Sequence, residues 1–213
     1  MRIIRNSFTA LIMLASISLA QTASAVTIDL VYEFDGVEPV QTYGTVDITQ
    51  NGTDLDFVIS YFGNLGSNAD IHQFYFNLTT PPDPVTGLVI TADNAPDNAY
   101  TLLGPSPSVT GGAGASFDWG VSFGNGGGPS GNGILQTATF TLSADQALSV
   151  SDLFETSSPN NTPLVNVAVH FQGTATRPGS EIVGGVVPVP AAIWLIGSGL
   201  LGLIGVARGK KAT

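Results

Sequence analysis

Short apolar–polar runs bounded by turn residues are the feature of this sequence that most restricts its fold. The clearest pair is Thr45–Thr49 and Leu55–Phe62, which flank the dipeptide Asn51-Gly52. Asn-Gly between two such runs predicts a β-hairpin, because a type I′ turn needs positive φ at both central residues. The hairpin in turn predicts antiparallel pairing early in the chain.

Other segments have the length and composition of strands, and they are Val26–Phe34, Ile71–Leu78, Gly87–Thr91, Phe117–Phe123, Ile134–Leu142 and Leu164–Gln172. Strand alternation places Asp54 and Asp56 together on a solvent face. Helical signals are limited to single turns, one capped by Ser143 and one over Val150–Glu155. This pattern predicts an all-β fold, either an antiparallel β-sandwich or a jelly roll.

The N-terminal end differs from this body. Met1–Arg5 is a short basic start, Phe8–Leu19 is an apolar run, and Ala23 and Ala25 form an A-x-A cleavage site around Ser24. Basic start, apolar run and small-residue site in this order predict a secretory signal peptide over residues 1–25. The alternative is an uncleaved anchor helix.

The C-terminal end carries a second hydrophobic segment. No charged residue occurs from Ile182 to Ala207, and the basic cluster Arg208–Lys211 follows at once. As a helix, Ala191–Ala207 would be about 25 Å long, near the short end of what a bilayer core requires. The basic cluster predicts that this end stays cytoplasmic and the body lies outside. The domain prediction is therefore 26–187 for the β body and 188–211 for the C-terminal signal.

The charge of the body excludes several functions. All sixteen acidic residues lie within Val26–Val187, together with Arg177 as one of the six basic residues. A body of this charge cannot neutralise a phosphate backbone, so we exclude a nucleic-acid partner. Anionic lipid head groups would repel it, so contact with the membrane is expected only through the C-terminal helix. The sequence has no cysteine, which excludes disulfides, thiolate metal sites and Fe–S clusters.

The residues that carry chemistry are few. His72 and His170 are the two histidines of the chain, and neither lies in a nucleophile motif. We expect His170 to face the surface or to bond a loop. A zinc site would require the fold to bring both histidines together with acidic residues, because their spacing matches no metal motif. No catalytic residue is predicted from these patterns.

We expect no cofactor, and the alternative is calcium, for which oxygen-bearing side chains offer two candidate sites. The first packs four such residues into one loop, namely Asp93, Asn94, Asp97 and Asn98. The second consists of Asn51, Asp54 and Asp56. Acid pairs could also perform glycoside hydrolysis, although the sequence does not show which pair has the required separation.

The C-terminal segment resembles the PEP-CTERM sorting signal of bacterial exosortase substrates. Three parts carry the resemblance: Val187-Pro188-Val189-Pro190, the apolar run Ala191–Ala207 and the basic tip Arg208–Lys211. Val189 stands where the family name has Glu, so the segment is similar to a VPxPA-type variant. The resemblance implies an exosortase-type membrane protease as partner and cleavage near Pro190. It also implies release to the cell surface or to an exopolysaccharide matrix, and it implies no catalytic residues.

These observations lead to one expectation of function and three alternatives. We expect an exported surface or matrix protein whose body is a structural or binding module rather than an enzyme. The first alternative is a calcium- or carbohydrate-binding β-sandwich. The second is a glycoside hydrolase that uses a carboxylate pair, and the third is a chain that stays tethered in the membrane.

Overall fold

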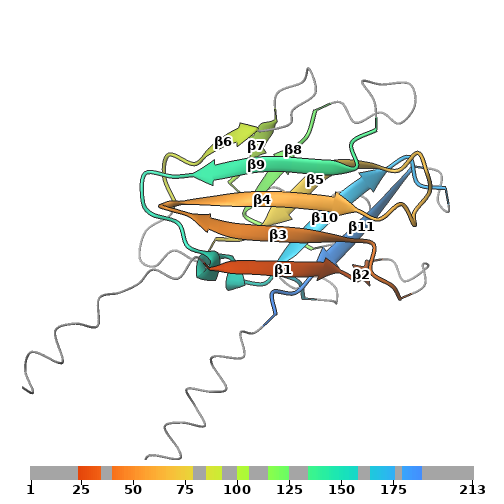
Figure 1. Cartoon of the computed structure of the whole chain (residues 1–213), viewed down its shortest axis with the longest axis horizontal. Helices are drawn as coiled ribbons and strands as arrows, with labels where there is room; N and C mark the ends of the chain where they lie inside the picture. Colours follow the sequence, from red (N-terminus) through yellow and green to blue (C-terminus); the bar gives the residue numbers. More distant parts are fainter. Residues whose placement is uncertain are drawn as a thin grey trace, which may run out of the picture.

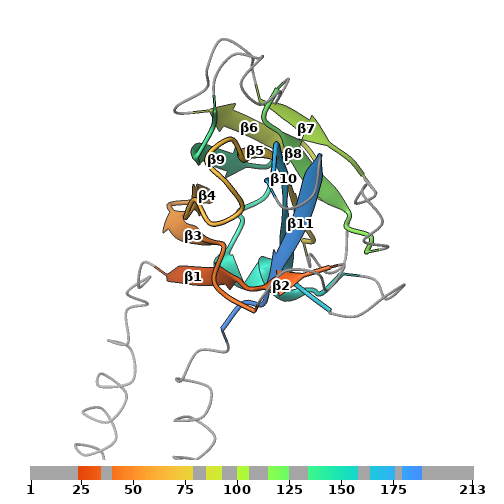
Figure 2. The ribbon, with the colours of Figure 1, turned by 90° about the vertical axis from the view of Figure 1, so that its right-hand side faces the viewer.

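Two antiparallel β-sheets make up most of the fold, one behind the other in Figure 1 and seen from the side in Figure 2. The computed structural model describes residues 24–34, 40–78, 85–92, 100–105, 115–124, 134–157, 164–175 and 179–188. The five-stranded sheet has the order β1 (Ala25–Leu30), β3 (Gly44–Asn51), β4 (Asp54–Tyr61), β9 (Thr137–Ser143), β6 (Val89–Ala92). The six-stranded sheet has the order β2 (Tyr32–Glu33), β11 (Ser180–Gly185), β10 (Val167–Gln172), β5 (Asp70–Phe76), β8 (Trp119–Ser122), β7 (Thr101–Leu103). The predicted all-β, sandwich-like architecture is confirmed.

The facing sides of the two sheets enclose a large apolar core. Phe57 and Phe140 of the five-stranded sheet stack with their ring centroids 4.8 Å apart. Phe74 of the six-stranded sheet lies 5.7 Å from Phe57, and all three side chains are buried. Because buried residues alternate with less buried ones along β4, one face of this strand enters the core and the other faces solvent. Apolar burial of this kind is the main favourable term in folding.

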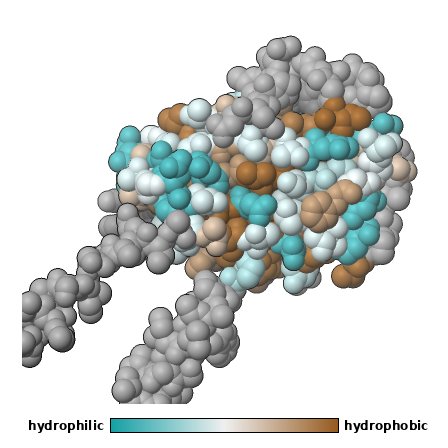
Figure 3. All heavy atoms as spheres, viewed as in Figure 1, coloured by the Kyte–Doolittle hydropathy of each residue, from teal (hydrophilic) through white to brown (hydrophobic). Residues whose placement is uncertain are grey.

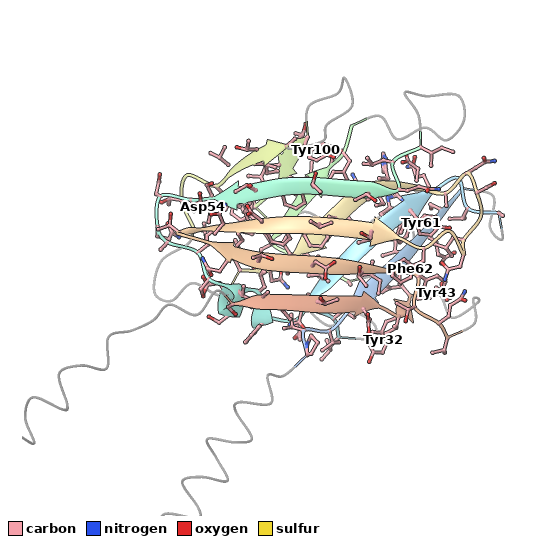
Figure 4. The ribbon with its side chains drawn as sticks, viewed as in Figure 1. Tyr32, Tyr43, Asp54, Tyr61, Phe62 and Tyr100 are labelled. Atoms are coloured by element: carbon pink, nitrogen blue, oxygen red, sulfur yellow. The ribbon has the colours of Figure 1, made fainter. Side chains whose placement is uncertain are left out.

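The predicted hairpin is confirmed, but its turn is centred one residue later than expected. Asn51 is the last residue of β3 and pairs with Asp54, so Gly52 and Thr53 are the two central residues. Gly52 has a φ of 62°, and glycine at the first central position is typical of a type II′ turn. Asp54, which opens β4, is labelled in Figure 4. Asn51 is therefore a paired residue of β3 and not a central residue of the turn, as the Asn-Gly pattern had predicted.

The predicted strand Val26–Phe34 is divided between the two sheets. β1 ends at Leu30, and β2 begins at Tyr32 in the six-stranded sheet. Between them, the Val31 N–H donates to Gly184 O at 3.1 Å, which already belongs to the second sheet. A single run of nine residues thus forms a corner that joins the two layers. The sequence pattern could not separate a long strand from two short ones.

The helical predictions were half right. A 3₁₀-helix, labelled η2, spans Val150–Phe154, and the Asp152 carboxylate accepts the Ser149 N–H at 2.8 Å. The turn predicted after Ser143 is wrong, because Ser143 ends β9 and the segment beyond it is not helical. The Leu148 N–H donates instead to Thr53 O at 2.9 Å, so this backbone is held by the hairpin rather than by a helix.

Two strands were not predicted. β7 lies inside a stretch that reads as an irregular loop, and β11 contains two glycines next to the uncharged C-terminal run. Gly185 is required by close packing. A Cβ there would lie 2.5 Å from Ile28 Cγ2 and 2.7 Å from Asp29 O, so a side chain would push β1 and β11 apart.

The outer face of the six-stranded sheet carries a smaller apolar cluster. Its buried members are Tyr75, Ala115, Phe117, Val165, Ala168 and Ile182. The rings of Tyr75 and Phe117 stack with centroids 5.9 Å apart. Strands β5 and β10 are consequently buried on both faces over part of their length.

Candidate functional site

The outer face of the five-stranded sheet carries an ordered array of hydroxyl and carboxylate side chains, with Val58 and Val89 among them. We call it the Thr/Asp face, and it consists of Thr27, Asp29, Thr45, Asp47, Thr49, Asp54, Asp56, Ser60, Thr91, Thr137, Thr139 and Thr141. The strand register aligns these residues in rows, for example Thr49, Asp56, Thr141 and Thr91 across four strands. The array exists because alternate residues of each strand share this face.

Hydrogen bonds across the strands orient the carboxylates of the Thr/Asp face. The Thr27 hydroxyl donates to Asp47 Oδ1 at 2.5 Å, and the Thr141 hydroxyl donates to Asp56 Oδ1 at 2.7 Å. The Asn51 amide donates to Asp56 Oδ2 at 3.0 Å. Cross-strand pairs of this type stabilise sheets and limit the motion of the side chains.

The Thr/Asp face is rich in acceptors, and no Lys, Arg or His occurs among its members. Figure 3 shows this side of the molecule as hydrophilic and near-neutral residues, with hydrophobic residues reaching the surface in several places. Chemically, such a face suits ligands that offer hydroxyl donors or positive charge. It is unsuited to polyanions, which agrees with the excess of acidic residues in the body.

The two candidate calcium sites have different outcomes. Asp93, Asn94, Asp97 and Asn98 lie outside the described residues. Asn51, Asp54 and Asp56 are brought together at the hairpin, as predicted from their spacing. There the Asn51 side chain donates its amide N–H to Asp56 Oδ2.

The fold brings the two histidines of the chain into contact. His72 of β5 and His170 of β10 lie with ring centroids 5.3 Å apart at an interplanar angle of 83°. His170 pairs with Gln73 and Phe171 pairs with Ile71, so His72 is the extra residue of a β-bulge. Bulges redirect side chains, and this one places both rings on one side of the sheet. His170 is 6% exposed, so the expectation that it faces the surface was wrong.

Gln73 fixes the protonation pattern of this pair. Its Oε1 accepts the Tyr75 hydroxyl at 2.5 Å and lies 3.3 Å from His170 Nδ1. Because a carbonyl oxygen can only accept, Nδ1 carries the hydrogen and Nε2 of His170 keeps a lone pair. Burial lowers the pKa of His72, and burial with a smaller contribution from His72 lowers the pKa of His170 to about 4. Both rings are therefore neutral at pH 7.

Among the described residues, the histidine pair has no acidic side chain with which it could form a metal site. Within the described part of the chain, no three His, Cys, Asp or Glu side chains lie close enough to hold a metal ion together. The buried carboxylate of Asp70, on β5, accepts the Leu135 N–H, and burial raises its pKa. On sequence grounds, a zinc site required both histidines and acidic residues to come together. The fold brings the histidines together, but no described acidic residue joins them.

The described fold meets both predicted processing sequences at its ends. Ala25 is the first residue of β1 and pairs with Thr49, whereas Ala23 lies outside the described residues. At the other end Val187 is buried and Pro188 is exposed. Val189 and Pro190 of the sorting motif lie outside the described residues. No helix in the described ranges is long and apolar enough to cross a bilayer, and Ala191–Ala207 falls outside those ranges.

Asn166 holds the end of the folded chain in place. Its side-chain Oδ1 accepts the Val187 N–H at 2.9 Å, and its Nδ2 donates to Phe154 O at 2.8 Å and to Glu155 O at 3.2 Å. Asn166 is itself buried. The Asn166 side chain therefore connects the backbone at Val187, after β11, to the end of η2.

We expect Asn166→Ala to lower the free energy of unfolding by about 1–3 kcal/mol, because it leaves buried backbone groups without their partner. Urea unfolding of the full chain measures this loss. Asn51→Ala is the matched control, since Asn51 is exposed, and we expect a change within about 0.5 kcal/mol. Equal losses in the two variants would contradict the role of Asn166.

Comparisons with known proteins found no match to this chain. No family model matches the chain, and no curated protein or solved structure is similar to it. The function must therefore be argued from the sequence and the geometry.

Sequence reasoning missed Gln73 as the partner of His170 and Tyr75 as the partner of Gln73. No local signal marks them, because the contact between β5 and β10 joins residues 97 positions apart in the chain. The Thr/Asp face could be anticipated in part, since alternation alone put Asp54 and Asp56 on the same face. The hydroxyl rows beside them depend on the strand order.

Proposed function

We propose that this chain is an exported protein of the cell surface or of an exopolysaccharide matrix. In this proposal residues 1–25 are a signal peptide, the β body is the cargo, and residues 188–211 are a sorting signal read by an exosortase-type membrane protease. Before cleavage the chain is tethered to the membrane by the C-terminal helix. The body acts as a structural or binding module.

One observation carries the proposal. The described β fold fills the interval between the two processing sequences and overlaps the end of each, since Ala25 begins β1 and Val187 is buried. The first proline of the motif, Pro188, is exposed directly after that last buried residue. Because prolines disfavour continuation of a strand ladder or of a helix backward, we propose that the motif is accessible to a protease. A folded body therefore leaves the motif available for cleavage.

Expression of the full chain in a bacterium with an exosortase, and in the same strain without it, tests the proposal. We expect mass spectrometry to find mature protein that starts at Val26 and ends near Pro190, and only in the strain with the protease. The Pro188→Ala/Pro190→Ala variant should accumulate with its C-terminal helix in the membrane fraction. The matched control is Pro81→Ala/Pro82→Ala, which removes two prolines outside the motif. Unprocessed chain in the cytosol, with both ends intact, would overturn the proposal.

The Thr/Asp face favours carbohydrate binding as the more specific form of this function. Sandwich and jelly-roll proteins both offer open sheet faces, and here the face presents carboxylates held by threonine hydroxyls. Sugar hydroxyls can donate to such carboxylates, and hydrogen bonds to charged groups contribute about 1.5–3 kcal/mol each. Neutral or amino-sugar polymers fit the charge of the face, whereas acidic polymers do not.

Co-sedimentation with insoluble polysaccharides tests carbohydrate binding. We expect Asp47→Asn/Asp56→Asn to weaken binding about tenfold or more, since each substitution removes one charge-assisted acceptor. Asp118→Asn/Glu155→Gln removes the same charge at exposed positions outside the face and should bind as the unmodified chain does. Equal weakening in both variants would show a general charge effect and would refute a site on this face.

A further inference from the structure

The two histidines of the chain, 98 residues apart, lie in ring contact, and His170 is buried while His72 is partly buried. Within the described ranges, neither His72 Nδ1 nor His170 Nε2 has a hydrogen-bond partner, and both atoms are buried. Buried polar atoms are almost always paired, and an unpaired one commonly marks the place of an ion or a water molecule. Two such atoms in adjacent rings therefore need an explanation.

The local structure prepares His170 as a metal ligand. Gln73 Oε1 accepts the hydrogen bond from His170 Nδ1–H, so the free lone pair of the ring is on Nε2. Metal-binding histidines have this arrangement, with one ring nitrogen on the ion and the other donating to an oxygen. Tyr75 in turn donates to the same Oε1 and fixes the orientation of the Gln73 amide. Gln73 is therefore a positioning residue.

The ring separation fits two imidazoles on one tetrahedral ion. Zn–N bonds of about 2.0–2.1 Å at a tetrahedral angle place the centres of two bound imidazole rings roughly 5 Å apart. The observed separation of His72 and His170 is 5.3 Å. The separation of the two rings is therefore that of two imidazoles on a shared ion.

We propose that His72 and His170 bind one divalent transition-metal ion, for which Zn²⁺ is the probe, and that this ion joins β5 to β10. Imidazole nitrogen is a ligand that suits Zn²⁺, Cu²⁺ and Ni²⁺, whereas Ca²⁺ and Mg²⁺ prefer oxygen. Because the described residues supply no third His, Cys, Asp or Glu, water completes the coordination shell. We therefore expect affinity in the micromolar range rather than that of a closed structural site.

The decisive experiment follows the two histidine rings of the full chain by NMR after labelling with ¹⁵N-histidine. We expect added Zn²⁺ to shift the Nε2 signal of His170 and the Nδ1 signal of His72 together and saturably. Ca²⁺ at the same concentration should shift neither. Zn²⁺ binding that leaves both rings unchanged would place the ion on the acidic surface and would overturn the proposal.

Substitutions then test each ligand. His72→Phe and His170→Phe keep an aromatic ring and remove the nitrogens, and we expect each to weaken Zn²⁺ binding at least tenfold. Gln73→Leu should weaken it by about 10–100-fold, as the loss of a ligand's supporting partner does. Bound Co²⁺ should give the intense visible bands of a tetrahedral site in the unmodified chain and lose them in both histidine variants. Unchanged affinity in the double histidine variant would refute the site, whether or not the carbohydrate proposal holds.

Discussion

Phe140→Ala should lower the free energy of unfolding by about 3–5 kcal/mol, the range for removal of a large aromatic side chain from a core. Phe140 belongs to β9 and is fully buried. Its ring centroid lies 4.8 Å from Phe57 in the same sheet and 6.1 Å and 6.0 Å from Phe74 and Phe123, which belong with the opposite sheet. Truncation leaves a cavity between the two layers that both sheets would have to fill.

Urea and thermal unfolding of the purified chain measure the effect. For a body of this size we expect Tm to fall by roughly 10–15 °C. Phe62→Ala removes the same side chain just after β4, where it is 56% exposed (Figure 4), and should change stability by about 0.5 kcal/mol or less. Phe140→Leu fills most of the cavity and should cost about 1.5 kcal/mol or less. If Phe140→Ala behaved like Phe62→Ala, the two sheets would not share this core.

The parts of the fold that the sequence predicted are those in which one face of a strand is buried. Along β4 buried and less buried residues alternate through all eight positions, so the period of two is visible in the residue types. The turn at Gly52 adds a second, local signal. Strands with both signals can be placed from the sequence because neither depends on what lies next to them.

The strands that the sequence did not predict are buried on both faces or are very short. Five consecutive residues of β11, Glu181–Gly185, are buried, so alternation disappears. Its two glycines give no strand signal, although they are there because β1 and Val165 pack against them. β7 has three residues, too few to show a period. The formation of β7 and β11 thus depends on tertiary packing and not on local strand propensity.

The candidate sites show the same division. The acidic half of the Thr/Asp face follows from alternation within one strand, and its hydroxyl half follows from strand order. The histidine pair depends on the neighbouring position of β5 and β10 and on the bulge that turns His72 to the side of His170. No property of the residues near either histidine encodes that bulge.

The histidine pair also predicts an acid-sensitive fold when no metal is bound. The unfolded chain protonates His170 near pH 6.5, whereas burial holds the pKa in the folded state at about 4. Between these values the unfolded state binds more protons, so stability falls as the pH is lowered through 6.5 toward 4 and levels off below that. His72 acts in the same direction, because its pKa is also lowered by burial.

Other groups act against this trend and must be separated from it. Burial raises the pKa of Asp70, so this carboxyl favours the folded state at low pH. Protonation of the many acidic residues also relieves their mutual repulsion. Around His170 itself, β5 offers His72, Gln73 and Tyr75, and β11 offers Ile182. Glu181 pairs with Phe171, so alternation places it on the opposite face of the sheet.

A comparison with His170→Phe isolates the contribution of His170, because the variant keeps a ring and removes the titration. With a chelator present, we expect the unmodified chain to lose roughly 2–3 kcal/mol more than the variant between pH 7.5 and pH 4.5. Urea unfolding at the two pH values gives both differences, and the effects of Asp70 and of the surface acids cancel between the two proteins. A variant that loses as much stability as the unmodified chain would show that His170 is protonated in the folded state, and the buried, neutral pair would then be wrong.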